Sequence, residues 1–180
     1  MARRAPFAIT LSSLMLQGVM MGGCAESVPK AQQSRDIVRA YRLDADDQPT
    51  LLIATAPGIL ATNAERDHLA RLLTERLGER RTHNVADGNA RQCEVHVLVT
   101  RLDRSSNFTP ALQAGLGQVH LDASVVVTPV GGGDPLNAFT ISKTFAWRGI
   151  YGTPEGIKKF EPAFADGIAA ALTGQPVETE

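Results

Sequence analysis

Hydrophobic and polar residues alternate with a period of two through three segments in the second half of the chain. In the first segment, 93–103, Val95, Val97 and Val99 alternate with Glu94, His96 and Leu98. The second and third, 119–127 and 139–147, repeat the pattern, although Lys143 interrupts the apolar face of the third. A period of two is typical of strands with one buried face. We therefore predict three antiparallel strands, with the glycine-rich turn 131–137 joining the second to the third.

Two other segments have a helical period. Thr62 and Glu65 stand three apart, which is the capping-box pattern, just before a stripe of leucines. We predict that this helix ends near Gly78. A second helix is predicted to begin near Pro162, because proline suits the first helical position, and to end at Gly174. Its apolar residues recur every fourth position and would face the sheet: Phe160, Phe164, Ile168 and Leu172.

A short apolar run, 50–56, lies between two prolines and precedes the first helix. Its continuous apolarity favours a strand that is buried on both faces. The predicted order is therefore strand, helix, three long strands, helix, and both helices can cover one face of one sheet. We predict a fold of the α/β class: a two-layer sandwich with two helices on one face of a mixed, mostly antiparallel sheet. It would form a single domain over residues 37–180.

The first residues follow the order of a secretory signal. Arg3 and Arg4 precede an apolar segment, and small residues lead into Cys24. Polar residues interrupt the segment, which disfavours a membrane-spanning helix because such a helix needs about 20 consecutive apolar residues. The stretch "MGGC" resembles the lipobox of bacterial lipoproteins, with methionine at the usual leucine position. The resemblance implies cleavage before Cys24 and lipidation of its thiol. The alternative is an ordinary secreted protein that is cut nearby.

These features divide the chain into a signal peptide at 1–23, a lipidated N-terminus with a polar tether at 24–36, and the domain. Ala25 follows the cysteine, whereas an aspartate there retains enteric lipoproteins in the inner membrane. The lipoprotein resemblance therefore implies an anchor in the outer membrane, with the domain facing the periplasm.

Charge and cysteine content narrow the class of protein. The chain has 18 basic and 19 acidic residues, a balance that disfavours nucleic-acid binding because that function needs a basic face. Once Cys24 is lipidated, Cys93 is the only remaining thiol, so no intramolecular disulfide can form. We expect Cys93 to be a small buried residue at the start of a strand rather than a nucleophile.

Three polar residues on one strand face, His120, Asp122 and Ser124, have the chemistry of a catalytic triad. Alternate residues on a strand stand about 6.5–7 Å apart, beyond the hydrogen-bond reach that a nucleophile and its base require. A connection that turns near residue 110 would place His96 opposite Ser124, four positions out of register with His120, which disfavours a shared metal. We expect no catalytic residue, no metal site and no cofactor, and therefore a protein that is not an enzyme.

The second half of the chain resembles a family of bacterial envelope lipoproteins that contain a domain of unknown function. The resemblance spans residues 50–173 and rests on "EVHVLVTRLDR", "AGLGQVHLDASVVV", "FTISKTFAWRG" and "FADGIAAAL". The domain of this family is similar to the amino-terminal domain of TolB and to the core of the curli-secretion lipoprotein. The turn "GGGDPLN" departs from the family, which often has Thr-Gly-Glu or Lys there. The resemblance implies a non-enzymatic envelope role and supplies no catalytic residues.

Two function classes follow: a lipid-anchored structural or assembly partner, or alternatively a periplasmic carrier of a small ligand or metal. The connection 104–118 favours the first, because hairpin loops usually have about two to five residues and long loops that expose apolar residues are more often functional. We expect its apolar residues to contact another envelope protein or a second copy of the chain: Phe108, Leu112 and Leu116. The alternative is that Phe108 and Leu112 pack back onto the sheet.

Overall fold

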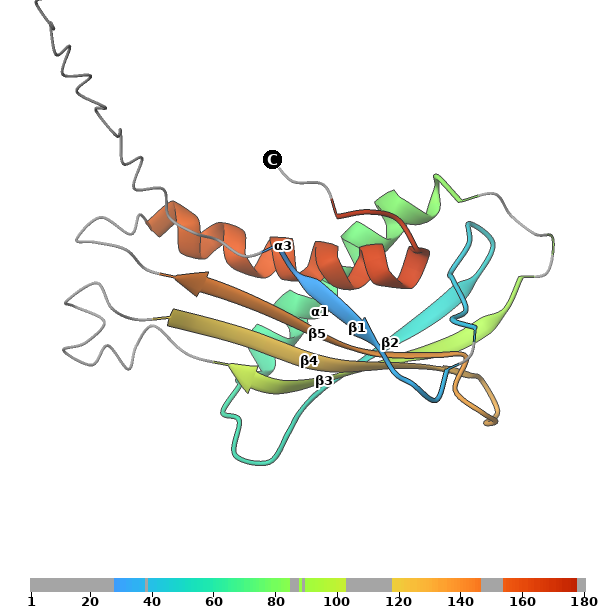
Figure 1. Ribbon diagram of the computed structural model, residues 1–180, viewed down its shortest axis with the longest axis horizontal. Coiled ribbons are helices and arrows are strands. Elements are labelled where there is room, and N and C mark those ends of the chain that lie inside the picture. The colour runs from blue at the N-terminus through green and yellow to red at the C-terminus, as the bar shows by residue number, and fades with distance from the viewer. Residues whose placement is uncertain are drawn as a thin grey trace, which may run out of the picture.

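The computed structural model of the chain describes residues 28–37, 39–84, 88, 90–102, 118–146 and 154–177. In these residues two helices lie on one face of a five-stranded sheet (Figure 1). The predicted two-layer α/β sandwich is confirmed. The elements in chain order are β1 (Lys30–Gln33), β2 (Gln48–Thr55), α1 (Asn63–Arg81), β3 (Gln92–Leu102), β4 (Gln118–Pro129), β5 (Asn137–Ala146) and α3 (Pro154–Thr173).

The sheet has the strand order β1-β5-β4-β3-β2. The three predicted long strands, β3, β4 and β5, pair antiparallel, and β1 joins β5 in the same sense. β2 instead pairs parallel with β3. Parallel neighbours need a crossover connection, and α1 supplies it. The sheet is therefore mixed and mostly antiparallel, as predicted.

The core lies between the sheet and the two helices, and the period-two pattern identifies the strand residues that line it. Val95 and Val125 are fully buried, whereas their chain neighbours on the other face are not. From α3, Phe164, Ile168 and Leu172 are also fully buried, as predicted. Burial of such side chains stabilises the fold by about 1.5–3 kcal/mol each. The wider buried cluster also includes Leu69, Leu73, Leu77, Cys93, Val97, Val99, Leu121, Ala123, Val127, Phe139 and Ile141.

The helix ends are confirmed at two positions and corrected at two. The capping box of Thr62 and Glu65 is present at the start of α1. Gly174 has φ +71° just after α3, and the backbone N–H of Gln175 donates to the Ala170 carbonyl at 3.0 Å, which is the bond of a Schellman end. The prediction that α1 ends near Gly78 is wrong, since α1 continues to Arg81.

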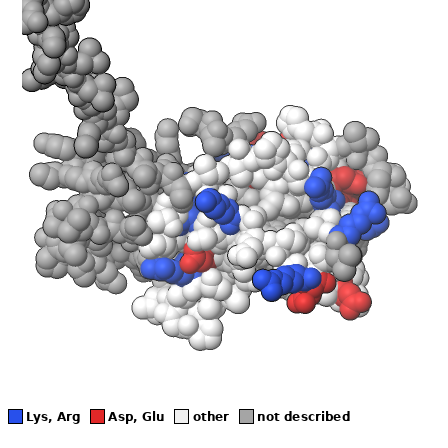
Figure 2. All heavy atoms as spheres, viewed as in Figure 1, with Lys and Arg blue, Asp and Glu red and all other residues white. Residues whose placement is uncertain are grey.

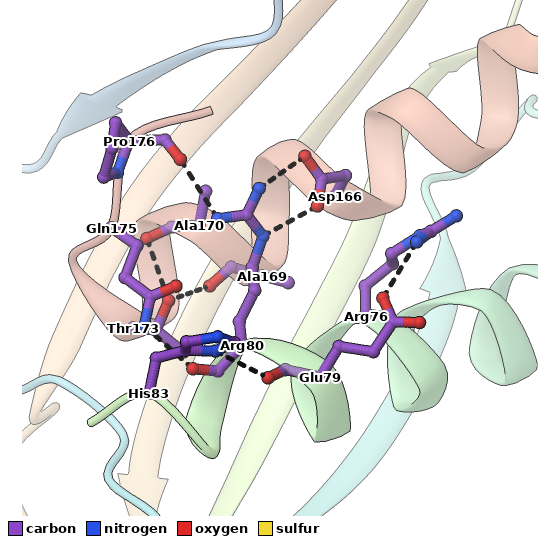
Figure 3. A network of polar contacts seen from close by, with 10 residues as sticks. All are labelled: Arg76, Glu79, Arg80, His83, Asp166, Ala169, Ala170, Thr173, Gln175 and Pro176. Atoms are coloured by element: carbon purple, nitrogen blue, oxygen red, sulfur yellow. Dashed lines mark hydrogen bonds and ion pairs between the residues drawn. The ribbon is translucent and has the colours of Figure 1, made fainter. Parts of the chain in front are cut away.

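Tertiary contacts explain why α1 continues beyond Gly78 (Figure 3). A glycine in a helix costs only about 1 kcal/mol relative to alanine. The Gln175 side chain donates to the Arg80 carbonyl at 2.8 Å, and the Arg80 guanidinium donates to the Pro176 carbonyl at 3.0 Å. These hydrogen bonds hold the last turn of α1 against the segment that follows α3. The hydrogen bonds of this last turn therefore outweigh the free-energy cost of a glycine at position 78, and the helix continues beyond it.

The predicted start of the second helix at Pro162 is also wrong. α3 begins at Pro154 and carries Pro162 in its interior. Pro154 occupies the helix start that suits proline. Pro162 removes one backbone donor, but the face that follows it buries Phe164 and Ile168 completely, and that burial holds the helix on the sheet.

Both edge strands differ from the sequence prediction. The tether predicted over 24–36 is wrong for Lys30–Gln33, which form β1. All four residues of β1 are exposed, so no burial pattern marks the strand in the sequence. β2 is an edge strand whose residues alternate between exposed and half-buried, so the prediction that it is buried on both faces is wrong. Its apolar run includes Leu52, which points to the side that no described helix covers.

Candidate functional site: the open face of the sheet

One face of the sheet carries both helices, and in the described part of the chain no helix covers the other face (Figure 1). We call this second surface the open face. The strand register brings residues from all five strands onto it. Its members include Lys30, Leu52, Ala54, Glu94, His96, Leu98, Arg101, His120, Asp122, Ser124, Val126, Ala138, Thr140 and Ser142.

Apolar residues gather at the β2 side of the open face. Leu52 is 43% exposed and lies opposite His96, which in turn lies opposite Val126. Leu98 is 39% exposed and lies one pair further along, opposite Ala54. We call Leu52, Ala54, Leu98 and Val126, together with His96 between them, the apolar patch. Side chains at such positions on adjacent strands are close enough to touch, so the patch is contiguous.

The patch borders the outer edge of β2. Among the described strands β2 pairs only with β3, so no described strand pairs with the backbone N–H and C=O groups of its outer edge. The strand reads "QPTLLIAT" and contains no charged residue. Natural edge strands are often protected by charges, and an uncharged apolar edge is a template for pairing with another strand. Figure 2 shows that neutral residues form most of the described surface in this view, with charges in small groups.

His96 belongs to the patch, and its ring lies beside a carboxylate on the same strand. Its Nε2 lies 3.0 Å from the Glu94 carboxylate, and both side chains are partly exposed. No group of three or more His, Cys, Asp or Glu residues that could hold a metal ion occurs in the described ranges. The predicted pairing of His96 with Ser124 is wrong by two residues, because Ser124 lies opposite Leu98. The connection between β3 and β4 is centred slightly later in the chain than residue 110.

A row of polar residues crosses the open face near the other end of β3. The Ser142 hydroxyl donates to the Asp122 carboxylate. Arg101 lies opposite Asp122, and Lys30 lies opposite Ser142 on the far side. A register shift between Val99 and Arg101 turns Arg101 out of the core face. The triad suggested by residue type is therefore replaced by a cross-strand pair of Asp122 with Ser142.

A buried carboxylate, Asp47, organises the turn that leads into β2. The Tyr41 hydroxyl donates to it at 2.6 Å, and the backbone N–H groups of Asp44 and Arg91 each donate at 3.0 Å. Burial, followed by the hydrogen bond to Asp47, raises the pKa of Tyr41 far above its ordinary value. The Arg91 guanidinium lies over the Tyr41 ring, 4.6 Å from its centre. These hydrogen bonds join the turn before β2 to Arg91, just before β3, and so fix the start of β2 against β3.

Cys93 is fully buried at the start of β3, as expected. Burial and the nearby Asp47 raise the pKa of its thiol to about 11, although Arg81 acts in the opposite direction. A thiol with this pKa is almost entirely protonated at neutral pH, and the thiolate is the reactive form. The position of Cys93 is therefore that of a core residue.

The other predicted site residues, Cys24, Phe108, Leu112 and Leu116, lie outside the described residues. The connection that contains the last three leaves β3 at Leu102 and enters β4 at Gln118. Sequence reasoning missed the apolar patch. The signal that could have found it was the apolar run at 51–54, because consecutive apolar residues in a strand place apolar side chains on both faces of the sheet.

Comparison with known proteins gives a fold and no family. No protein-family profile matches the sequence, and no curated protein sequence matches it. The PelC dodecamer from Paraburkholderia phytofirmans is similar in structure, with a TM-score of 0.52 and 13% identity, over 80% of this chain and 98% of that chain. At this identity the likeness shows a shared fold.

Two further solved structures are more distant. A variant of the same PelC dodecamer has a TM-score of 0.47 and 12% identity, over 78% of this chain and 97% of that chain. A protein from Caulobacter crescentus CB15, provisionally named a lipoprotein, has a TM-score of 0.32 and 16% identity, over 69% of this chain and 82% of that chain. Within the described ranges, no helix is both long and apolar enough to cross a bilayer.

Proposed function

We propose that this chain is a lipid-anchored, non-enzymatic lipoprotein of the bacterial envelope that acts as a structural or assembly partner. The lipobox-like "MGGC" supports the anchor at Cys24, and Ala25 supports placement in the outer membrane, facing the periplasm. The apolar patch beside the outer edge of β2 is the observation that carries the assembly role.

The patch has the physical properties of a protein contact. Leu52 and Leu98 each leave about two fifths of their surface in water, on adjacent strands of an otherwise well-packed sheet. Removing apolar surface from water contributes roughly 25 cal/mol per Å². A strand added at the edge of β2 would gain main-chain hydrogen bonds and would cover Leu52 in the same step.

The occupant that we propose is a second copy of this chain. PelC, which has the same fold, forms a dodecamer. A cyclic assembly of this chain would require each copy to offer two different surfaces. Here β2 lies at one edge of the sheet and β1 at the other. The uncharged β2 brings no like-charge repulsion to such a contact.

The assembly role is tested by measuring the mass of the detergent-solubilised protein with light scattering. We expect the wild-type protein to be oligomeric and the double variant Leu52→Lys with Leu98→Lys to be monomeric. Thr140→Lys adds a charge to an exposed position elsewhere on the open face and is the matched control. It should leave the mass unchanged. Circular dichroism checks that each variant is folded. A monomeric wild-type protein at every concentration would exclude self-assembly through this patch.

The lipid anchor is tested independently. In cells labelled with radioactive palmitate, the wild-type protein should incorporate the label and lose its signal peptide. The variant Cys24→Ser should accumulate as an unlabelled precursor. Normal processing of this variant to a soluble periplasmic protein would show that the chain is secreted without a lipid.

A further inference from the structure

The backbone groups of β2 point in two directions. The N–H of Gln48 donates to the Arg91 carbonyl at 2.8 Å, and the N–H of Ala56 donates to the Val99 carbonyl at 2.9 Å. Gln48 and Ala56 therefore face β3. Successive residues of a strand direct their backbone groups to opposite sides, so the even-numbered residues between them face β3 as well. The odd-numbered residues of β2 direct their N–H and C=O groups to the outer edge.

Two prolines bound the donors of this outer edge. Pro49 and Pro57 are odd-numbered positions and have no N–H group. The outward donors between them are those of Leu51, Ile53 and Thr55. The pattern is symmetric, because each proline stands four residues from Ile53. An edge with this symmetry is complementary to a second copy of itself that runs antiparallel and is centred on the same residue.

The backbone groups match in that register. Ile53 lies opposite Ile53 of the second copy, and Leu51 lies opposite Thr55 of the second copy. Each such pair of outward-facing residues exchanges two N–H···O=C hydrogen bonds. All the outward donors of both strands are then satisfied. Pro49 lies level with Pro57 of the second copy, so the residues that have no donor meet each other beyond the paired run.

The side chains of the open face match in the same register. Leu52 lies opposite Ala54 of the second copy, in a pair whose side chains stand close together. Within one copy Ala54 lies opposite Leu98, so the small alanine leaves room for a leucine on either side of it. The apolar patches of the two copies thereby become one continuous surface. β2 has no charged residue, so the symmetric contact brings no like charges together.

The other edge of the sheet fits β2 less well. The Ser34 N–H donates to the Ala138 carbonyl at 2.8 Å, so the outward-facing residues of β1 are Ala31 and Gln33. A neighbouring β1 would therefore pair with only two of the three outward-facing residues of β2. It would also bring the charge of Lys30 beside the apolar patch, because Lys30 lies on the open face. Donor number and charge both favour pairing of β2 with β2.

We propose that two copies of the chain pair edge to edge through β2, antiparallel about a two-fold axis at Ile53, so that their sheets join into one. This inference rests on the proposed self-assembly and names the contact within it. Such a contact uses the same surface of both copies and joins them in pairs, so any larger assembly needs a second surface. The open faces of the two copies lie on the same side of the joined sheet.

The pairing is tested by disulfide crosslinking of the lipidated protein in detergent. Ile53→Cys places two thiols opposite each other, where the Cα atoms of a hydrogen-bonded antiparallel pair stand about 5.5 Å apart, within the range of a disulfide. Ala31→Cys is the matched control, because residue 31 faces outward from the other edge of the sheet. Both variants keep Cys24 and Cys93, so background crosslinking is the same in both. After oxidation, non-reducing electrophoresis should show several-fold more covalent dimer for Ile53→Cys.

A backbone substitution tests the hydrogen bonds of the same contact. Thr55→Pro removes an outward donor but no hydrogen bond between β2 and β3, and proline is tolerated at such edge positions. The loss of two hydrogen bonds per pair of copies should raise the dissociation constant by about tenfold or more in light scattering. Ala31→Pro makes the same change at the edge of β1 and should leave the dissociation constant unchanged. Circular dichroism checks that both variants are folded.

Three outcomes would overturn the pairing. If the wild-type protein is oligomeric but Ile53→Cys crosslinks no more than Ala31→Cys, the two-fold contact is wrong and the self-assembly proposal remains. Mixing differently tagged Ile53→Cys and Ala31→Cys copies detects the alternative contact. A predominant mixed dimer would show that β2 pairs with β1 instead. A wild-type protein that is monomeric at every concentration would overturn both the pairing and the self-assembly proposal.

Discussion

Arg80 of α1 and Asp166 of α3 form a bidentate ion pair that joins the two helices (Figure 3). The guanidinium Nε and Nη2 atoms lie 2.7 Å from the two carboxylate oxygens. The side chains are 10% and 21% exposed, so the pair is mostly shielded from water. Paired fork geometry of this kind is the strongest arrangement that arginine makes with a carboxylate.

Asp166→Ala should therefore destabilise the domain. Removing one partner leaves the other charge poorly compensated in a mostly buried position, and we expect a loss of about 2–3 kcal/mol in the free energy of unfolding. Glu79→Ala is the matched control, because it removes the more exposed pair of Arg76 with Glu79 in the same helix. Such an exposed pair contributes about 0–1 kcal/mol. Denaturant unfolding measures both, and equal losses would contradict the special role of the Arg80 pair.

Two helical glycines should respond to alanine in opposite directions. Apart from its chain neighbours and the backbone of its own helix, no atom lies within 4 Å of the place where a Cβ on Gly78 would stand. Gly78→Ala should therefore stabilise the domain by about 0.5–1 kcal/mol. At Gly167 the same change would clash with Pro29 and should be destabilising despite the gain in helix propensity. Thermal unfolding of the two variants measures both changes in stability. Stabilisation by Gly167→Ala would mean that the contact with Pro29 gives way easily.

The thiol of Cys93 should make stability depend on pH in the alkaline range. Burial raises its pKa from the ordinary value of 9.0 to about 11, so the folded state holds the proton more tightly than the unfolded state. The contribution is complete below pH 9 and is lost as the pH rises toward 11. The variant Cys93→Ala lacks this loss. The difference in unfolding free energy between wild type and variant, measured from pH 8 to 11, should shift in favour of the variant, and a constant difference would contradict the assignment.

The role of the connection between β3 and β4 as a contact with a partner stays a prediction. The double variant Phe108→Ser with Leu112→Ser, in the lipidated protein, should lower the amount of partner protein, or of further copies of the chain, that co-purifies after crosslinking. Its free energy of unfolding should stay within about 0.5 kcal/mol of the wild-type value. A large loss of stability would instead show that the two side chains pack onto the sheet. If neither property changes, the connection is a spacer.

The sequence by itself determined the elements whose pattern is repeated and local. Apolar residues recur every second position in β3, β4 and β5 and every fourth position in α3. These periods arise because each element buries one face, and the order of apolar residues in the sequence therefore predicts that face. The capping box at Thr62 and the helix end at Gly174 are equally local, since their hydrogen bonds join residues only a few positions apart.

The tertiary structure alone decided the edges and the helix lengths. β1 forms because its residues pair with β5. All four of its residues are exposed, so their sequence has no hydrophobic pattern that predicts this pairing. The apolar run of β2 has the composition of a buried strand, but Leu52 is exposed because it projects from the face of the sheet that no described helix covers. The last turn of α1 depends on Asp166 and Gln175, which lie 86 and 95 residues away from Arg80 in sequence. Contacts at such separations are absent from any local pattern, and they form the apolar patch and bring Pro29 against Gly167 of α3.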